Sequence, residues 1–283
     1  MDRSALNEYL GRASVLIHRL GDPPPDPLPV PEGELFVGVD LGTAYLTVVV
    51  LDENDQVVSG EFTFAEVARD GLVVDYVGAV DLVKVMKTRL EARLGRDLRN
   101  AASGYPPGVA RSEVAATGNV VEAAGFICRA LVDEPTAANS LIRMENGVIV
   151  DVGGGTTGIA VVKDGDVVYT ADEATGGTHL SLVIAGARDI PFAEAEQLKL
   201  DPQAQPGLFP TIRPVLEKVA SIAARHIDGY SVPEIVLVGG TTKFLRTAEV
   251  VEEYTGLPAW VPDHPEWVTP IGMAMNCKGK ENL

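Results

Sequence analysis

Residues 35–58 read LFVGVDLGTAYLTVVVLDENDQVV, and residues 148–168 read VIVDVGGGTTGIAVVKDGDVV. Both stretches show the same order of features: a β-branched run, an Asp, a glycine turn, a Thr, and two further runs separated by a polar turn. Runs rich in Val and Ile favour strands, and Asn54-Asp55 and Asp164-Gly165 supply the turn residues between them. Because similarity within one chain indicates a repeated structural unit, the sequence predicts a duplicated domain.

Each stretch places an Asp before its glycine turn and a Thr after it. Glycines let backbone N–H groups approach an anion closely and the Thr hydroxyl adds a donor, so such a turn suits phosphate oxygens. Asp40 and Asp151 suit a hydrated Mg²⁺, which prefers carboxylates, waters and substrate phosphates. One turn of this kind can be an ordinary strand end. Two in matching positions predict a clamp that grips a polyphosphate from both sides.

Two further motifs follow predicted strands. Residues 133–138 read DEPTAA at a junction between a strand and a helix, and Pro135 suits the first helical turn. Glu134 is left at the strand end, where it either caps the helix or orients an attacking water. Residues 238–242 read VGGTT after a buried strand, and the missing side chains allow a flat base to lie against the backbone.

Strands that alternate with helices predict mixed α/β layers. Hydrophobic spacing predicts helices near residues 4–20, 80–94, 114–125, 136–144, 178–187, 192–200 and 211–228, and further strands at 101–105, 127–132 and 234–238.

These motifs, in this order, resemble the signatures of the superfamily of actin, DnaK-type chaperones and sugar kinases. The matching segments are residues 40–45, 134–138, 151–156, 235–242 and 270–274. The resemblance covers about residues 35–276 and implies an α/β, two-domain actin-like ATPase fold with ribonuclease H-like duplicated domains. The nucleotide, ATP or ADP with Mg²⁺, is then expected in the cleft between the domains.

The resemblance also assigns roles to residues. Asp40 and Asp151 would hold the metal, and Glu134 and Asp151 would be catalytic. Glu196 and Lys199 match a helix segment that holds ribose and adenine. The residues expected to contact the nucleotide are Gly42, Thr43, Ala44, Tyr45, Gly153, Gly154, Gly155, Thr156, Thr157, Gly176, Gly177, Glu196, Lys199, Gly239, Gly240 and Thr241.

Short length and three segments, residues 67–75, 104–108 and 170–177, narrow the resemblance to the EutJ family of ethanolamine-utilisation operons, which are associated with bacterial microcompartments. That resemblance implies a chaperone-like protein whose cleft closure, set by the bound nucleotide, acts on a microcompartment enzyme or shell partner. Two other functions fit the fold: an actin-like filament or scaffold protein, and a small-molecule kinase, although a kinase would need a base that the sequence does not place.

One departure from the chaperones concerns hydrolysis. DnaK-type proteins carry a catalytic lysine in an inserted subdomain, and residues 61–100 are too short to contain it. Lys84 and Lys87 lie on a predicted helix without the family's surrounding motif, so we expect solvated side chains there. ATP turnover is therefore expected to be slow or stimulated by a partner.

Charge and composition restrict the partners. The 283 residues carry 40 acidic and 23 basic side chains, a formal net charge of −17, which repels nucleic acid backbones and anionic membranes. Cys128 and Cys277 show no disulfide or zinc spacing. No apolar run approaches the ~18 residues of a membrane span, and the first residues lack a signal-peptide pattern. We expect a soluble cytoplasmic protein, associated with a microcompartment if the family resemblance holds.

Three parts are expected along the chain: residues 1–33, an amphipathic helix with a proline-rich linker; residues 34–147 with 266–283, the first ATPase subdomain; and residues 148–265, the second. The N-terminal helix allows two interpretations. It packs on the body of the protein, or it is a detachable docking peptide for a shell or cargo helix.

Overall fold

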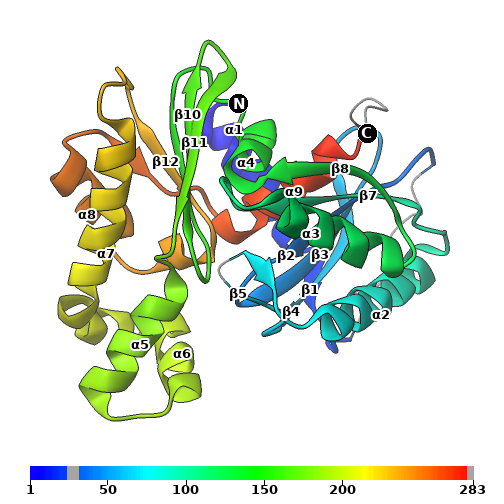
Figure 1. The fold of residues 1–283 in the computed structure, drawn as a ribbon, viewed down its shortest axis with the longest axis horizontal. Coiled ribbons are helices and arrows are strands. Elements are labelled where there is room, and N and C mark those ends of the chain that lie inside the picture. The colour runs from blue at the N-terminus through cyan, green and yellow to red at the C-terminus, as the bar shows by residue number, and fades with distance from the viewer. Residues whose placement is uncertain (24–31, 70, 279–283) are drawn as a thin grey trace.

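The computed structural model describes residues 1–23, 32–69 and 71–278. Two large sheets lie side by side, each covered by helices, and the helices α1 (Arg3–Ser14), α4 (Glu134–Ile142) and α9 (Val268–Asn276) lie between them (Figure 1). The two expected copies of the strand pattern therefore sit in separate sheets, and the expected α/β duplication is confirmed.

The first sheet has six strands in the order β1-β4-β3-β2-β7-β8. β2, β3 and β4 form an antiparallel meander, while β7 and β8 continue the sheet in parallel and β1 runs parallel to β4. The bounds are β1 Ile17–Arg19, β2 Phe36–Leu41, β3 Tyr45–Leu51, β4 Val57–Phe64, β7 Asn100–Tyr105 and β8 Ile127–Asp133, and a small separate hairpin joins β5 Ala68–Arg69 to β6 Leu72–Val73.

Alternation along β3 explains why helices cover both faces of this sheet. Val48 and Val50 pack with the helices α2 (Tyr76–Leu94) and α3 (Arg111–Ala123), whereas Val49 and Leu51 pack with α1 and α9. All four side chains are buried because successive residues of a strand point to opposite faces.

The second sheet has five strands in the order β11-β10-β9-β12-β13. Its bounds are β9 Gly147–Val152, β10 Thr157–Lys163, β11 Asp166–Glu173, β12 Ile235–Val238 and β13 Ala259–Trp260, and the remaining helices are α5 Gly177–Arg188, α6 Phe192–Leu200, α7 Gln205–Ile227, α8 Thr247–Thr255 and the short 3₁₀ helices η1 Gly240–Lys243 and η2 Pro265–Trp267. Val148 and Val150 pack against α7, while Ile149 faces the cluster that contains α1, α4 and α9.

Most expected helices and strands are present, with shifted ends. α2 begins at Tyr76 rather than at residue 80, because Asp75 caps it by accepting a hydrogen bond from Gly78 N. α7 begins at Gln205 rather than at 211 and runs through Pro210 and Pro214. Burial of Leu208, Phe209 and Ile212 in one apolar cluster favours the helix there despite the prolines. We predicted no helix for α8 or α9.

The N-terminal expectation needs correction. The helix ends at Ser14, and Ile17–Arg19 forms β1 instead of a further turn of helix, since the edge of β4 offers it backbone partners. Leu6 and Leu10 are 1% and 0% exposed in the core cluster between the sheets. The helix therefore packs on the body, which is the first of the two interpretations, and a docking role for this segment stays a prediction. The proline-rich linker falls on residues 24–31, outside the described residues.

Helix α1 touches structure from both sheets. Arg3 pairs with Glu234 (2.5 Å), which precedes β12, and Asn7 accepts a hydrogen bond from Asp263 N (3.0 Å). On the other side, the Tyr9 hydroxyl donates to Asp55 O in the turn between β3 and β4 (2.6 Å). Within the described residues, no helix combines the length and the apolar character that crossing a membrane requires.

Candidate functional site

A cavity of about 530 Å³ is lined by residues of both large sheets. It brings together residues that the sequence analysis selected from distant segments: Asp40, Gly42, Thr43, Ala44, Tyr45, Glu134, Asp151, Gly153, Gly154, Gly155, Thr156, Glu196, Lys199, Gly239, Gly240 and Thr241. Thr157, Gly176 and Gly177 are the expected residues that do not line it.

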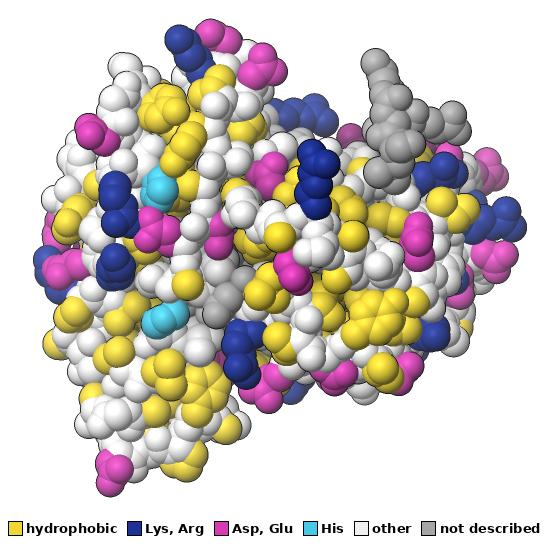
Figure 2. All heavy atoms as spheres, in the orientation of Figure 1, with side chains coloured by type: hydrophobic (Ala, Val, Ile, Leu, Met, Phe, Trp, Pro, Cys, Tyr) yellow, Lys and Arg dark blue, Asp and Glu magenta, His cyan; other side chains and the backbone are white. Residues whose placement is uncertain are grey.

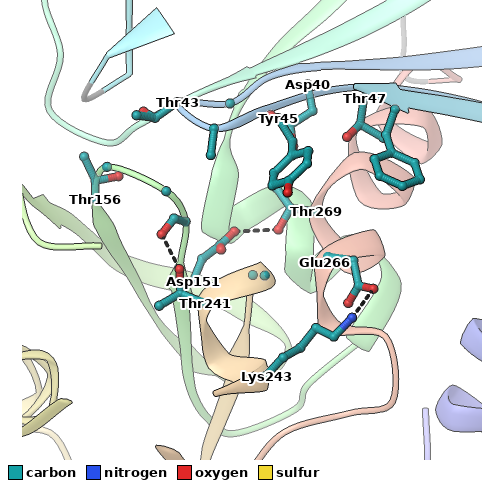
Figure 3. A pocket seen from close by; sticks show the side chains of 18 of the residues that line it. Asp40, Thr43, Tyr45, Thr47, Asp151, Thr156, Thr241, Lys243, Glu266 and Thr269 are labelled. Atoms are coloured by element: carbon teal, nitrogen blue, oxygen red, sulfur yellow. Dashed lines mark hydrogen bonds and ion pairs between the residues drawn. The ribbon is translucent and has the colours of Figure 1, made fainter. Parts of the chain in front are cut away.

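The two glycine turns both line this cavity and lie next to each other. A Cβ built on Gly154 would lie 2.9 Å from Ala44 Cβ and 3.0 Å from Ala44 N, so the tip of the second turn touches the first. Thr43 and Thr156 project from the two turns (Figure 3). The backbone of both turns is thus available to one ligand.

The second turn is held from behind by the start of α5. Gly153 O accepts a hydrogen bond from Gly177 N (2.9 Å), and Gly154 O accepts one from Thr178 N (2.8 Å). A Cβ on Gly176 would lie 2.7 Å from Gly153 O, so only glycine fits there without a shift of the turn. Gly176 and Gly177 therefore lie behind the cavity wall and support the turn rather than line the cavity.

Thr157 also lies behind the wall. It is 0% exposed, and its hydroxyl donates to Thr175 O (2.6 Å). As the first residue of β10, Thr157 points away from the side that Thr156 occupies, because side chains alternate along a strand.

Three carboxyl groups, those of Asp40, Glu134 and Asp151, line the cavity and influence one another's pKa through their charges. Burial and the charge of Asp151 raise the pKa of Asp40 to about 7, and burial raises the pKa of Asp151 to about 6. Burial, followed by the charges of Asp40 and Asp151, raises the pKa of Glu134 well above its ordinary value. Burial disfavours the charged form of all three groups, so a cation bound among them would stabilise their carboxylates.

Glu134 is free to face the cavity because another residue caps its helix. Asp133 accepts a hydrogen bond from Thr136 N (3.1 Å) and is the N-cap of α4. Of the two interpretations that the sequence left for Glu134, the helix cap is therefore wrong.

The opposite end of the cavity is formed by α6 and by the segment after β12. Lys199 Nζ donates to Glu196 Oε2 (2.7 Å) and to Gly177 O (3.2 Å), and burial lowers the pKa of Lys199 while Glu196 opposes that effect. Gly239 has a φ of +87°, and a Cβ there would overlap Asp151 Oδ1. The turn into η1 needs glycine for both reasons.

Several lining residues were missed by the sequence analysis. Thr269 donates its hydroxyl hydrogen to Asp151 Oδ2 (2.5 Å), and Lys243 pairs with Glu266 (2.8 Å), as Figure 3 shows. Phe62 and Trp267 also line the cavity, with their ring centroids 5.1 Å apart. Thr269 directly precedes the recognised motif at 270–274, and this position in the sequence was the only feature that could have suggested a role for it.

Lys84 and Lys87, the lysines that the sequence analysis considered, lie away from the cavity. Lys84 is exposed on α2, and Lys87 on the same helix pairs with Glu91 rather than being fully solvated. Neither lines the cavity, whose lysines within the described residues are Lys199 and Lys243.

The donors fit a hydrated magnesium ion better than a cage of protein ligands. Nowhere in the described ranges do three or more His, Cys, Asp or Glu side chains gather closely enough to hold a metal directly. Magnesium is commonly bound through one or two carboxylates while it keeps several waters and contacts phosphate oxygens. Asp40 and Asp151, each beside a glycine turn that lines the cavity, provide that arrangement.

Comparison with known proteins places these features in a family context. Residues 148–272 match the family model of cell division protein FtsA, and residues 59–186 match that of the MreB/Mbl protein. Ethanolamine utilization protein EutJ of Escherichia coli K12 is 41% identical over 250 residues, which are 88% of each chain. A chaperone protein HscA homolog of Vibrio parahaemolyticus is 26% identical over 240 residues, covering 69% of this chain and 39% of that protein.

Solved structures agree with these matches. The crystal structure of ethanolamine utilization protein EutJ from Carboxydothermus hydrogenoformans has a TM-score of 0.88 and 42% identity, and covers 97% of this chain and 99% of that one. MreB5 of Spiroplasma citri bound to ADP has a TM-score of 0.69 at 18% identity, and covers 87% of this chain and 97% of that one. The second likeness shows the fold alone, and the expected actin-like ATPase fold is confirmed.

Proposed function

Because this chain belongs to the EutJ family of ethanolamine utilization proteins, we propose that it is an ATP-binding, chaperone-like protein whose cavity takes ATP or ADP with Mg²⁺. The observation that carries the proposal is the pair of adjacent glycine turns, each preceded by a buried or half-buried Asp whose pKa is raised. Paired turns of this kind supply N–H donors for phosphate, and the two Asp side chains supply ligands for a cation.

Different residues of the cavity would bind different parts of the nucleotide. Thr43, Thr156 and the turn amides would hold phosphate oxygens, and Asp40 and Asp151 would hold the hydrated metal. Bound magnesium would offset phosphate charge that the carboxylates otherwise repel. The Glu196–Lys199 pair and the segment from Gly239 to Thr241 would hold ribose and base.

Glu134 is the residue we propose as proton acceptor and positioner for an attacking water. Its raised pKa makes its carboxylate a better base near neutral pH than an ordinary Glu. Turnover would be slow, since among the described residues the cavity's lysines are Lys199, already paired with Glu196, and Lys243, paired with Glu266. A partner that reorganises the site would raise the rate.

The partner we propose is an enzyme or shell protein of the ethanolamine-utilisation microcompartment, met in the cytoplasm. We assign residues 34–147 with 266–283 to one ATPase subdomain and 148–265 to the other. A nucleotide that contacts both subdomains would change the distance between them. That movement would change the surface that the protein presents to the partner. The partial likeness to an HscA-type chaperone supports this use of the fold.

The first test is calorimetric titration with ATP, with Mg²⁺ and with EDTA. Asp151→Ala should weaken magnesium-dependent ATP binding about 100-fold or more, because it removes a ligand of the metal that links the protein to the phosphates. Glu134→Gln should leave affinity within about threefold and slow hydrolysis about 10- to 100-fold. Exposed Asp166 on β11 provides the control, Asp166→Ala. Equal ATP affinity in wild type and Asp151→Ala would contradict the proposal.

An actin-like filament protein is the second candidate. It is favoured by the matches of residues 148–272 and 59–186 to the FtsA and MreB/Mbl models. Sedimentation with ATP and Mg²⁺ separates the two functions: a pellet that forms with ATP and dissolves with ADP favours the filament, and a soluble complex with a microcompartment protein favours the chaperone-like role.

A further inference from the structure

Helix α9 packs backbone to backbone on the two elements that carry Asp40 and Glu134. Gly38 lies on β2 two residues before Asp40, and a Cβ there would overlap Pro270 O and lie 2.7 Å from Ala274 N. Gly272 in α9 faces α4, the helix that begins with Glu134, and a Cβ at Gly272 would overlap Ala137 O. These contacts fix α9 relative to both carboxylates, since no side chain separates the backbones.

The same helix reaches the third carboxylate through a side chain. Thr269, in the first turn of α9, donates to Asp151 Oδ2 (2.5 Å), although the two residues are 118 positions apart. Both are buried, with 5% and 7% of their surface exposed. In Figure 3 the Thr269 hydroxyl and the Asp151 carboxylate point toward one another across the gap between α9 and β9.

The remaining oxygen of Asp151 is limited on its other side. Gly239 approaches so closely that a Cβ would overlap Asp151 Oδ1. The carboxylate is therefore set between a hydroxyl on α9 and a glycine after β12. The two contacts together restrict the orientation of the carboxylate.

We propose that Thr269 is a positioning residue that fixes the Asp151 carboxylate relative to Asp40 and Glu134, so that one helix sets the geometry of all three acids. The inference rests on the proposed function, because the geometry it sets is that of a site for magnesium and nucleotide. It concerns a residue outside the recognised motifs, whose role follows only from the contact with Asp151.

The chemistry of Thr suits this role. A β-branched side chain has few χ1 rotamers, so the hydroxyl is presented in a restricted direction. A hydrogen bond from a hydroxyl to a carboxylate is stronger than one between neutral groups. Loss of the hydroxyl would let the carboxylate turn and would weaken its hold on a hydrated cation, while leaving the glycine turns intact.

The test is a magnesium titration of ATP affinity in three variants. Thr269→Val keeps size and branching but removes the donor, and should weaken the magnesium-dependent part of ATP binding about tenfold. Thr269→Ser keeps the donor and should stay within about threefold of wild type. ATP affinity measured in EDTA should be the same in all. Thr117→Val is the matched control, because Thr117 is equally buried on α3, away from the cavity.

The outcomes separate this inference from the proposed function. Wild-type protein without magnesium-dependent ATP binding would overturn both. Wild-type binding that survives unchanged in Thr269→Val, or that falls equally in Thr269→Ser, would overturn the positioning role alone. Urea unfolding of each variant distinguishes lost affinity from lost fold, and if Thr269→Val does not fold, Thr269→Ala carries the same comparison with Thr269→Ser.

Discussion

The turn at residues 40–44 and the turn at 151–156 have the same sequence pattern but different surroundings. Gly153 O in the second turn accepts hydrogen bonds from Gly177 N and from the Thr241 hydroxyl, so α5 and η1 both hold it. In the first turn, Ala44 O accepts one from Ala65 N (3.1 Å). Two elements outside its hairpin thus make the second turn a preorganised wall, and we expect the first turn to adjust more when a ligand binds.

The Asp residues of the two turns also differ, both in their hydrogen bonds and in their pKa values. Asp151 is bound by Thr269, which lowers its pKa and partly offsets burial, and the net value is about 6. The pKa of Asp40 rises to about 7, through burial and then through the charge of Asp151. The same motif thus produces an anchored acid, Asp151, which accepts a hydrogen bond from Thr269, and a more labile acid, Asp40, whose pKa is raised further. The difference comes from residues that are distant in the sequence.

The largest expected effect tests the difference in rigidity between the two turns through one glycine close to each of them. Gly176→Ala would push a Cβ into Gly153 O and Gly154 O (2.7 and 2.8 Å), backbone atoms fixed by other hydrogen bonds. Gly42→Ala meets one backbone atom, Tyr45 O (2.7 Å), in a turn that can shift. Urea unfolding should show a loss of about 3 kcal/mol for Gly176→Ala and about 1 kcal/mol for Gly42→Ala. Equal losses would contradict the difference in rigidity.

The second comparison uses pH. Asp40 has a folded pKa of about 7, above the roughly 4 of an unfolded chain, so the folded state holds this proton longer as pH rises. Stability of the ligand-free protein should therefore fall between about pH 4 and pH 7. Asp40→Asn should remove the share of that fall due to Asp40 and add up to roughly 4 kcal/mol at pH 8, with almost no gain at pH 4. Asp151 and Glu134, whose pKa values are also raised, should cause the rest of the fall.

Two controls make the pH experiment decisive. Asp151→Asn should gain less than Asp40→Asn at pH 8, because its pKa rises only to about 6 and the variant loses the acceptor of the Thr269 hydroxyl. Asp166→Asn, on the exposed start of β11, should change nothing. Urea midpoints from pH 4 to 8, without nucleotide or Mg²⁺, measure all three. A larger gain for Asp151→Asn would reverse the assignment of anchored and labile acids.

Local chemistry explains what the sequence could predict. The turns, their acids and Glu134 were found because Asp, Gly and Thr at fixed spacing limit what a strand end can do, and the structure gathers them around one cavity. The glycine pair at 176–177 was predicted to contact the nucleotide, but neither residue lines the cavity. Its place behind the turn could not be known, because close packing and ligand contact both require glycine.

Long-range packing explains which features the sequence could not predict. The pattern of Leu6 and Leu10 shows that one face of the first helix must be covered, but an amphipathic pattern does not say by what. The cover is the cluster between the sheets, including Val236 and Ile271. Thr269 is likewise an unremarkable Thr until the fold brings Asp151 to it from 118 residues away.

The smallest expected effect concerns the bond from η1 to the second turn. Thr241→Val removes the donor to Gly153 O (2.7 Å), but Gly177 N still donates to that oxygen, so no buried carbonyl is left without a partner. The loss should be only about 1 kcal/mol in urea unfolding, against less than about 0.5 kcal/mol for Thr88→Val on the exposed face of α2. If Thr241→Val costs as much as Gly176→Ala, η1 rather than α5 holds the turn. Its rigidity would then depend on the segment proposed to receive the base, and the two ends of the cavity would not be independent.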